Sequence, residues 1–200
     1  MREPFDTFIA HYAEPDTLFI TCGLPCTAKT GLGETILRLK GYPLLRTDVV
    51  RVDLLKGEDI FDERVASDMN RRTRVYDEVF KQAAESLDSG GAVVIDATFI
   101  TQALRERAAE IAAGRGKKLV IMETTCSQDV ALSRIRRRSR QDYESNAITE
   151  QAYFNNERQF EPVDIKELKR LHPQLTVAYL RVDTTYDSPD RWYVVAMEEI

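Results

Sequence analysis

The chain has 200 residues, of which 43% are hydrophobic and 30% charged, and its formal net charge is −5 at pH 7. These values are typical of a soluble globular protein that can form a core without metal or disulfide bonds. The acidic balance argues against a protein that coats nucleic acid or anionic membrane, because such proteins are basic overall. The three cysteines and two histidines lack the spacing of a zinc site, and a reducing compartment is their simplest setting.

The N-terminal residues 1–6 contain no apolar signal-peptide core. The longest apolar runs, such as residues 92–95, have the length of strands and are too short to span a bilayer. The sequence therefore predicts a soluble, cytoplasmic protein without a membrane partner.

Short apolar runs alternate with amphipathic helical segments along the chain. This alternation is typical of an α/β fold with a parallel sheet that is covered by helices on both faces. No internal repeat or linker-like segment divides the sequence, so residues 1–200 are expected to form a single domain. The expected strands are residues 17–22, 43–46, 92–96, 118–124 and 176–183.

Helices are expected between these strands. The clearest covers residues 64–88, where apolar residues recur at intervals of three and four and two glycines follow. A second covers residues 101–113, and a final helix is expected behind Ser188 with Pro189 at its first position. The polar segment 139–149 has no period and is expected to be a mobile loop between two helices.

The first expected strand runs directly into a loop, residues 23–30, that is followed by a helical segment. A tight turn here points backbone N–H groups inward, and the helix N-terminus adds the positive end of its dipole. Lys29 can reach the outer phosphates of a nucleotide, and the hydroxyl of Thr30 can bind a bridging magnesium ion. This phosphate loop therefore predicts binding of ATP and Mg²⁺; its residues are Gly23, Leu24, Pro25, Cys26, Thr27, Ala28, Lys29 and Thr30.

The phosphate loop departs from the pattern G-x-x-x-x-G-K-[ST] in one required place. Ala28 stands where the second glycine belongs, and at positive φ it would cost about 1–2 kcal/mol and lower the affinity for ATP. Cys26 fills a place that glycine often occupies; its thiol could have a lowered pKa, or it is simply a small side chain. An ordinary strand–helix turn with an exposed lysine is the alternative to a phosphate site.

Residues 17–162 resemble the P-loop kinases of the group called AAA-family predicted kinases, near phage polynucleotide 5′-kinase, gluconate kinases and zeta toxins. The resemblance implies a parallel five-stranded sheet of order 2-3-1-4-5, a small arginine-rich lid at about 134–150, and ATP-dependent phosphoryl transfer. It leaves the acceptor open among nucleic-acid ends, sugars, sugar nucleotides and small metabolites. The motifs that carry it are Gly23-Leu-Pro-Cys-Thr-Ala-Lys-Thr30, Thr47-Asp-Val-Val-Arg51, Val94-Ile-Asp-Ala-Thr-Phe99, the run 134–140 and Arg158-Gln-Phe-Glu-Pro162.

Asp48 lies just beyond the second expected strand, and ligands gather at the carboxyl ends of parallel strands. A carboxylate there can accept the proton of an attacking hydroxyl and orient it towards the γ-phosphate. The resemblance implies that Asp48 is this base and that Arg51 helps to hold the acceptor. The alternative is that Asp48 only caps a helix at residues 49–55.

Asp96 closes the third expected strand beside the phosphate loop. It resembles the acidic residue that holds magnesium or its water in P-loop proteins, so Thr30 and Asp96 are the expected metal ligands. An aspartate that merely starts a turn is the alternative. Thr98 and Arg105 follow and can line the acceptor side, although Arg105 could equally lie on a solvated helix face.

Five arginines lie within residues 134–140. Like charges at this spacing repel one another, and an anion would relieve the repulsion. Arg134 and Arg138 are four residues apart on one helical face, and they match the two lid arginines of the family, which close over the triphosphate. The cluster could instead be a solvated helix face or contact nucleic acid.

The predicted function is a kinase that transfers the γ-phosphoryl group of ATP to a hydroxyl of a small-molecule or nucleotide-like acceptor. A nucleic-acid end is possible as acceptor but not favoured. One alternative is a catalytically weakened nucleotide-binding module with a regulatory or interaction role, which the changes in the phosphate loop support. The other is a simple NTPase. The expected catalytic residues are Asp48, Lys29, Arg138 and Arg134, and the expected substrate-binding residues are Arg51, Thr98 and Arg105.

Overall fold

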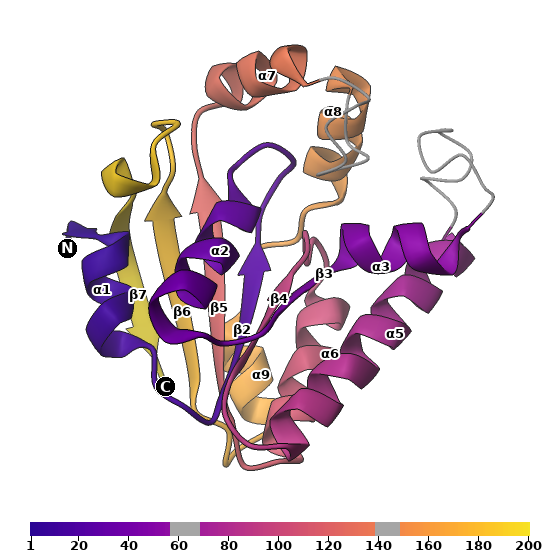
Figure 1. The fold of residues 1–200 in the computed structure, drawn as a ribbon, viewed down its shortest axis with the longest axis vertical. Helices are drawn as coiled ribbons and strands as arrows, with labels where there is room; N and C mark the ends of the chain where they lie inside the picture. Colours follow the sequence, from indigo (N-terminus) through magenta and orange to yellow (C-terminus); the bar gives the residue numbers. More distant parts are fainter. Residues whose placement is uncertain (57–68, 139–148) are drawn as a thin grey trace.

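The computed structural model describes residues 1–56, 69–138 and 149–200, and it has an α/β fold with helices on both faces of a central sheet (Figure 1). The expectation of this fold class is confirmed. The strands are β1 (Glu3–Pro4), β2 (Thr17–Cys22), β3 (Leu44–Arg46), β4 (Val93–Asp96), β5 (Lys118–Thr125), β6 (Val177–Asp183) and β7 (Tyr193–Glu199). The helices are α1 (Phe5–Tyr12), α2 (Lys29–Lys40), α3 (Thr47–Leu54), α5 (Met69–Asp88), α6 (Gln102–Ala113), α7 (Gln128–Arg137), α8 (Glu150–Gln159), α9 (Ile165–Leu171) and the 3-10 turn η1 (Pro189–Arg191).

The five expected strands pair in parallel, in the spatial order β3-β4-β2-β5-β6. The central strand β2 has six buried residues, as suits a strand that is covered on both faces. Two further strands extend the sheet, because β7 pairs antiparallel with β6, and β1 pairs antiparallel with β7. The prediction of a five-stranded parallel sheet was therefore wrong: the sheet has seven strands of mixed orientation.

The additional strand β7 lies where a final helix was expected. Pro189 does begin a helical turn, but this turn, η1, has only three residues and ends before Trp192. The residues that follow are Tyr193-Val-Val, aromatic and β-branched types that favour strands, and they pair with the edge of β6. The helix prediction failed because the edge of a strand distant in sequence determines the conformation here.

Alternate residues of β2 face opposite layers of helices. Leu18 and Ile20 pack in one core cluster with apolar side chains of α5, α6 and α9. Phe19 packs in a second cluster with apolar side chains of α1 and α2. The carboxyl ends of the parallel strands, where loops can form a site, are therefore supported by a packed core on each face.

The boundaries of the helices follow local signals. α6 begins after Thr101, whose hydroxyl accepts a backbone N–H as its N-cap. α5 starts at Met69 among the described residues, and the expected start at residue 64 lies outside them. Most of the expected loop, residues 139–148, also lies outside the described residues. No helix within the described parts of the chain is long and apolar enough to cross a membrane.

α7 and α8 lie above the phosphate loop, at the end of the sheet where the parallel strands terminate (Figure 1). A small apolar cluster joins them to this loop. It contains Cys26 of the loop, Ala131, Leu132 and Ile135 of α7, and Tyr153 of α8. Ile135, which lies in the described part of the expected lid, therefore belongs to the same apolar cluster as Cys26 of the loop.

Candidate functional site

The phosphate loop connects β2 to α2, and its first residue must be glycine. Gly23 has φ +134°, and a Cβ there would lie 2.8 Å from Thr124 Oγ1 and 2.9 Å from the Thr124 carbonyl oxygen. Its N–H donates to the Thr98 carbonyl over 3.1 Å. The start of the loop is thus held between the ends of β5 and β4, and any side chain would force it out of place.

Two non-glycine residues of the loop have left-handed backbones. Cys26 has φ 62°, and Ala28 has φ 65° and lies at the N-cap of α2. A left-handed conformation costs an L-residue about 1–2 kcal/mol, so the loop holds its shape against a local preference. Burial raises the pKa of the Cys26 thiol, more than the nearby Arg138 and Lys29 lower it. The suggestion of a lowered thiol pKa was therefore wrong, because Cys26 is packed among apolar side chains.

Lys29, the first residue of α2, folds back over the loop. Its Nζ donates to the Leu24 carbonyl over 2.6 Å. Burial lowers the pKa of Lys29, and the negative charge of Asp96 offsets only part of this effect. Thr27 supports the same turn, since its hydroxyl contacts the Leu24 carbonyl at 2.8 Å and Thr124 Oγ1 at 2.6 Å. The ammonium group is therefore held over the turn of the loop, against the Leu24 carbonyl.

Thr30 and Asp96 lie together as a pair. The Thr30 hydroxyl donates to Asp96 Oδ2 over 2.7 Å, and the Thr21 hydroxyl donates to Asp96 Oδ1 over 3.1 Å. Asp96 is only 7% exposed, and Arg46 Nε lies 3.7 Å from its Oδ2. One hydroxyl and one carboxylate on neighbouring elements fit Mg²⁺, which takes few protein ligands and keeps several waters or phosphate oxygens.

Asp48 lies in the first turn of α3, directly after β3. The helix begins at Thr47 with Arg46 as its N-cap, so Asp48 is not the cap, contrary to the alternative from sequence. Burial raises the pKa of Asp48 to about 6; the charges of Arg51, Lys29 and Arg46 oppose this and that of Asp96 adds to it. A half-buried carboxylate thus has the groups of the phosphate loop and of β4 as electrostatic neighbours.

Several guanidinium nitrogens at this end of the sheet are buried without a hydrogen-bond partner. Within the part of the chain that the structure describes, they are Arg46 Nε, Arg51 Nε, Arg51 Nη1 and Arg138 Nη1. Buried polar groups in proteins are almost always hydrogen-bonded, and exceptions call for an explanation such as a missing ion or ligand. All three arginines are electrostatic neighbours of the loop or of Asp48.

Arg105 has a different environment from the one expected. It is completely buried in α6, and its five N–H donors all meet protein oxygens. No donor remains for an acceptor, so the placement contradicts its expected role in substrate binding. Thr98, which lies two residues beyond β4, is half-buried, and its carbonyl accepts the hydrogen bond from the Gly23 N–H. The partners of Arg105 are the carbonyls of Phe99, Ile100, Glu161 and Pro162 and the side chain of Gln102.

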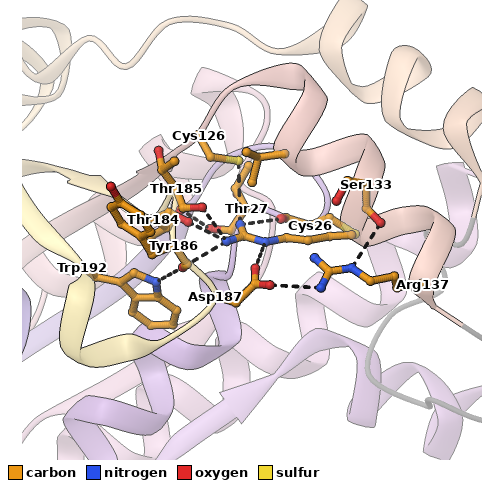
Figure 2. Close-up of polar contacts among 12 residues, drawn as sticks. Cys26, Thr27, Cys126, Ser133, Arg137, Thr184, Thr185, Tyr186, Asp187 and Trp192 are labelled. Carbon is orange, nitrogen blue, oxygen red and sulfur yellow. Dashed lines mark hydrogen bonds and ion pairs between the residues drawn. The ribbon is translucent and has the colours of Figure 1, made fainter.

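Arg134 and Arg138 do not share a helical face. α7 ends at Arg137, and Arg138 follows in an extended conformation. Arg134 Nε donates to Asp187 over 2.9 Å, and its other nitrogens contact the Cys26 carbonyl, Cys126 Sγ and three carbonyls of the segment that follows β6. These partner residues are labelled in Figure 2. The structure thus places Arg134 as a clamp between α7, the phosphate loop and residues 184–187. Of these two arginines, Arg138 is the one with a buried nitrogen, Nη1, that has no hydrogen-bond partner within the described residues.

Sequence reasoning missed Arg46 and Trp192 as parts of the site. Arg46 ends β3 two residues before Asp48, so its position at the carboxyl end of a strand was a usable signal. Trp192 packs on Gly31 in the first turn of α2, where an added Cβ would lie 2.3 Å from its ring. Its indole N–H donates to the Tyr186 carbonyl over 2.7 Å. Nothing in the local sequence could place a residue of the last strand region against α2.

The phosphate loop, the Thr30–Asp96 pair and the parallel strands between helices define the P-loop kinase fold. The model of a family described as AAA domain matches residues 18–163, and the chain belongs to this family. This confirms the resemblance seen in the sequence. A search of curated proteins finds no match.

Solved structures share the fold at low sequence identity. A gluconokinase from Sinorhizobium meliloti 1021 is 16% identical with a TM-score of 0.56, covering 86% of this chain and 84% of its own. A sugar kinase from Janibacter sp. HTCC2649 is 11% identical with a TM-score of 0.57, covering 88% of each chain. A protein from Chloroflexus aurantiacus J-10-fl, provisionally described as a kinase, is 22% identical with a TM-score of 0.62, covering 85% of this chain and 89% of its own. At these identities the likeness shows the fold alone.

Proposed function

We propose that this protein transfers the γ-phosphoryl group of ATP to a hydroxyl of a small-molecule acceptor, with Mg²⁺ as cofactor. The observation that carries the proposal is the convergence on Asp48. This carboxyl, whose pKa is raised to about 6, has Lys29, Asp96 and Arg51 among its electrostatic neighbours, although these residues come from different elements. The likeness to kinases, two of them named as a gluconokinase and a sugar kinase, supports a small acceptor over a nucleic-acid end.

The phosphates of ATP lie against the loop in this proposal. The backbone N–H groups of residues 23–30 and the ammonium of Lys29 bind the β- and γ-phosphates, and Lys29 exchanges the Leu24 carbonyl for a phosphate oxygen. Arg138 reaches the γ-phosphate with its unpartnered Nη1. When bound at Thr30 and Asp96, magnesium would neutralise charge on the phosphates. Arg134 acts indirectly, by holding the Cys26 carbonyl.

Asp48 is the proposed general base. Its carboxylate accepts the hydrogen of the acceptor hydroxyl, the hydroxyl oxygen forms the bond to the γ-phosphorus, and the bond to ADP breaks. A pKa of about 6 leaves Asp48 ionised at pH 7 but more basic than an exposed aspartate. Burial therefore improves the match between the base and the pH at which it operates.

A nucleotide-binding module without transfer is the second candidate, because Cys26 and Ala28 have left-handed backbones that glycine would adopt without strain. Phosphoryl transfer from labelled ATP to sugars, sugar acids, nucleosides and oligonucleotide ends separates the candidates. We expect label in one small acceptor, and Lys29→Ala should abolish both this transfer and stabilisation by Mg-ATP. Binding of ATP without its consumption would favour the module, and consumption that no acceptor increases would favour a simple NTPase.

A further inference from the structure

Two carbonyl groups of the phosphate loop are held by side chains that lie outside the loop. Arg134 Nη1 donates to the Cys26 carbonyl over 3.2 Å. The Thr184 hydroxyl donates to the Thr27 carbonyl over 2.9 Å. These two peptide units join Thr27 to its neighbours Cys26 and Ala28, which have the left-handed φ values of 62° and 65°. The strained part of the loop is therefore the part that the two side chains contact.

Thr184, the first residue after β6, is itself firmly held. It is completely buried, and its N–H donates to the Thr125 carbonyl over 2.8 Å. Its hydroxyl also lies 3.1 Å from that carbonyl, and its own carbonyl accepts a hydrogen bond from Arg134 Nη2 over 2.7 Å. Because its backbone is fixed to the end of β5, the hydrogen bond from its hydroxyl fixes the loop in turn.

The segment that follows β6 also holds Arg134. Asp187 accepts from Arg134 Nε over 2.9 Å, and the Tyr186 carbonyl accepts from its Nη2 over 3.0 Å. The same carbonyl accepts the indole N–H of Trp192, and Tyr186, Asp187 and Trp192 lie together in Figure 2. The match to the family model ends at residue 163. The loop is thus supported by a part of the chain that lies beyond this match.

The direction of the two carbonyls decides where the adjacent N–H groups point. In a trans peptide the N–H points opposite to the C=O, so the N–H groups of Thr27 and Ala28 point away from Arg134 and Thr184. Successive N–H groups on one side of such a turn form a concavity that binds anions. Holding the carbonyls on the outside therefore preserves the shape that suits a phosphate.

We propose that Thr184, with Arg134 and Asp187, keeps the phosphate loop in its nucleotide-binding shape, in place of the glycines that the loop lacks at positions 26 and 28. We call these three residues the loop clamp. Glycine adopts a left-handed backbone without strain, whereas Cys26 and Ala28 need an external restraint to do so. Thr184 is a positioning residue, since it acts on ATP only through the loop. The inference rests on the proposed function, which places the triphosphate of ATP in this loop.

A double-mutant cycle between Thr184 and Ala28 tests the proposal by calorimetric titration of Mg-ATP. Thr184→Val removes the hydroxyl, so the loop relaxes and nucleotide binding must restore the strained shape. The affinity should fall about 5- to 30-fold, which is the equivalent of one left-handed L-residue. In the Ala28→Gly background that shape has no such cost, and Thr184→Val should lower the affinity about twofold or less. Equal falls in the two backgrounds would overturn the proposal.

Two further variants separate contact with the loop from a general loosening of the sheet. Thr184→Ser keeps the hydroxyl and should retain the affinity of the wild type. Thr125→Val is the matched control, because the Thr125 hydroxyl donates to the Val182 carbonyl over 3.2 Å and not to the loop. It should leave the affinity unchanged. A fall as large as that of Thr184→Val would refute the specific role of Thr184.

The stability of the protein gives a result that needs no nucleotide. Thr184→Val releases the strain at Ala28, so it should lower the midpoint of urea denaturation less in the wild type than in Ala28→Gly, where no strain is released. Equal shifts would contradict the proposal. A wild type that binds no nucleoside triphosphate would contradict the proposed function, and the stability cycle would then decide alone whether the clamp holds a strained loop.

A second cycle covers the case in which Thr184→Val does not fold. Asp187→Asn weakens the hold on Arg134 at an exposed position, so the core is left intact. Its partner variant is Cys26→Gly, because Arg134 holds the Cys26 carbonyl. Asp187→Asn should lower the affinity for Mg-ATP up to about fivefold in the wild type and less in Cys26→Gly. A fall of the same size in both backgrounds would again overturn the proposal.

Discussion

The surroundings of Arg51 in α3 and of Arg105 in α6 use the same chemical group, a buried guanidinium, in opposite ways. Arg105 is completely buried, and its five donors tie the end of β4 and the start of α6 to residues 161–162, which precede α9. Arg51 is almost as deeply buried, yet two of its nitrogens have no partner within the described residues. The same contrast recurs between Arg134, which is fully engaged, and Arg138, which is not. Burial alone therefore does not distinguish the two kinds of arginine, whereas unpaired donors do, and they mark Arg51 and Arg138 as the arginines expected to bind a ligand.

The largest expected effect concerns the carboxylate beside Arg51. Asp48→Asn should lower phosphoryl transfer by about 10²–10⁴-fold, because the acceptor hydroxyl loses its base, while the affinity for Mg-ATP changes little. Transfer and calorimetric titration of ATP measure the two effects. Asp53→Asn on the same helix is the matched control, since Asp53 is exposed and paired with Lys56 at 3.4 Å. Full transfer by Asp48→Asn would place the base elsewhere.

Substitution of the two buried arginines tests the comparison itself. Arg105→Met should lower the free energy of unfolding by about 3–5 kcal/mol, because several buried carbonyls lose their donor. Arg51→Met should leave it unchanged or raise it, since an unpaired buried charge is removed. Urea denaturation of both variants gives the two values. Equal losses of stability would contradict the distinction between a completed and an incomplete arginine.

The pH dependence of transfer and of stability tests whether the environment of Asp48, one turn before Arg51, raises its pKa. The pKa of Asp48 is raised from 3.8 to about 6, so transfer should fall about fivefold between pH 6 and pH 5 as the base becomes protonated. Between about pH 4 and pH 6 the folded state holds the proton more tightly than the unfolded state. This contribution therefore lowers the free energy of unfolding as pH rises through that window. Denaturation of wild type and Asp48→Asn should diverge across it, and identical pH profiles would show that Asp48 is not perturbed.

The smallest expected effect lies in the phosphate loop. Its departure from the usual pattern is a strained backbone, whereas that of Arg51 is a set of unpaired donors. Ala28 has φ 65°, so Ala28→Gly should relieve up to about 1–2 kcal/mol of backbone strain, partly offset by added entropy of the unfolded chain. We expect tighter binding of Mg-ATP by a few-fold, measured by calorimetry. Ser133→Gly, in the exposed part of α7, is a control for the general effect of glycine and should lower stability. Unchanged binding by Ala28→Gly would show that the loop accommodates alanine without cost to the nucleotide.

The sequence by itself determined the phosphate loop, the five core strands and the order in which Asp48 and Asp96 follow their strands. These features are local: a glycine turn before a helix and a short apolar run are specified by adjacent residues. The resemblance to the kinase family also pointed to Arg51, through the pattern Asp-x-x-Arg. It could not give the antiparallel extension by β7, because a strand at a sheet edge depends on a partner distant in sequence.

Only the tertiary structure decided which arginines are free. Arg105 and Arg134 occupied plausible positions in the sequence, yet their donors are taken by carbonyls of residues 161–162 and 184–187, far along the chain. In contrast, Nε and Nη1 of Arg51 and Nη1 of Arg138 lack such partners within the described residues. A guanidinium is recognised as a ligand site or as a structural clamp by the oxygens around it, and those oxygens come together only when the chain has folded.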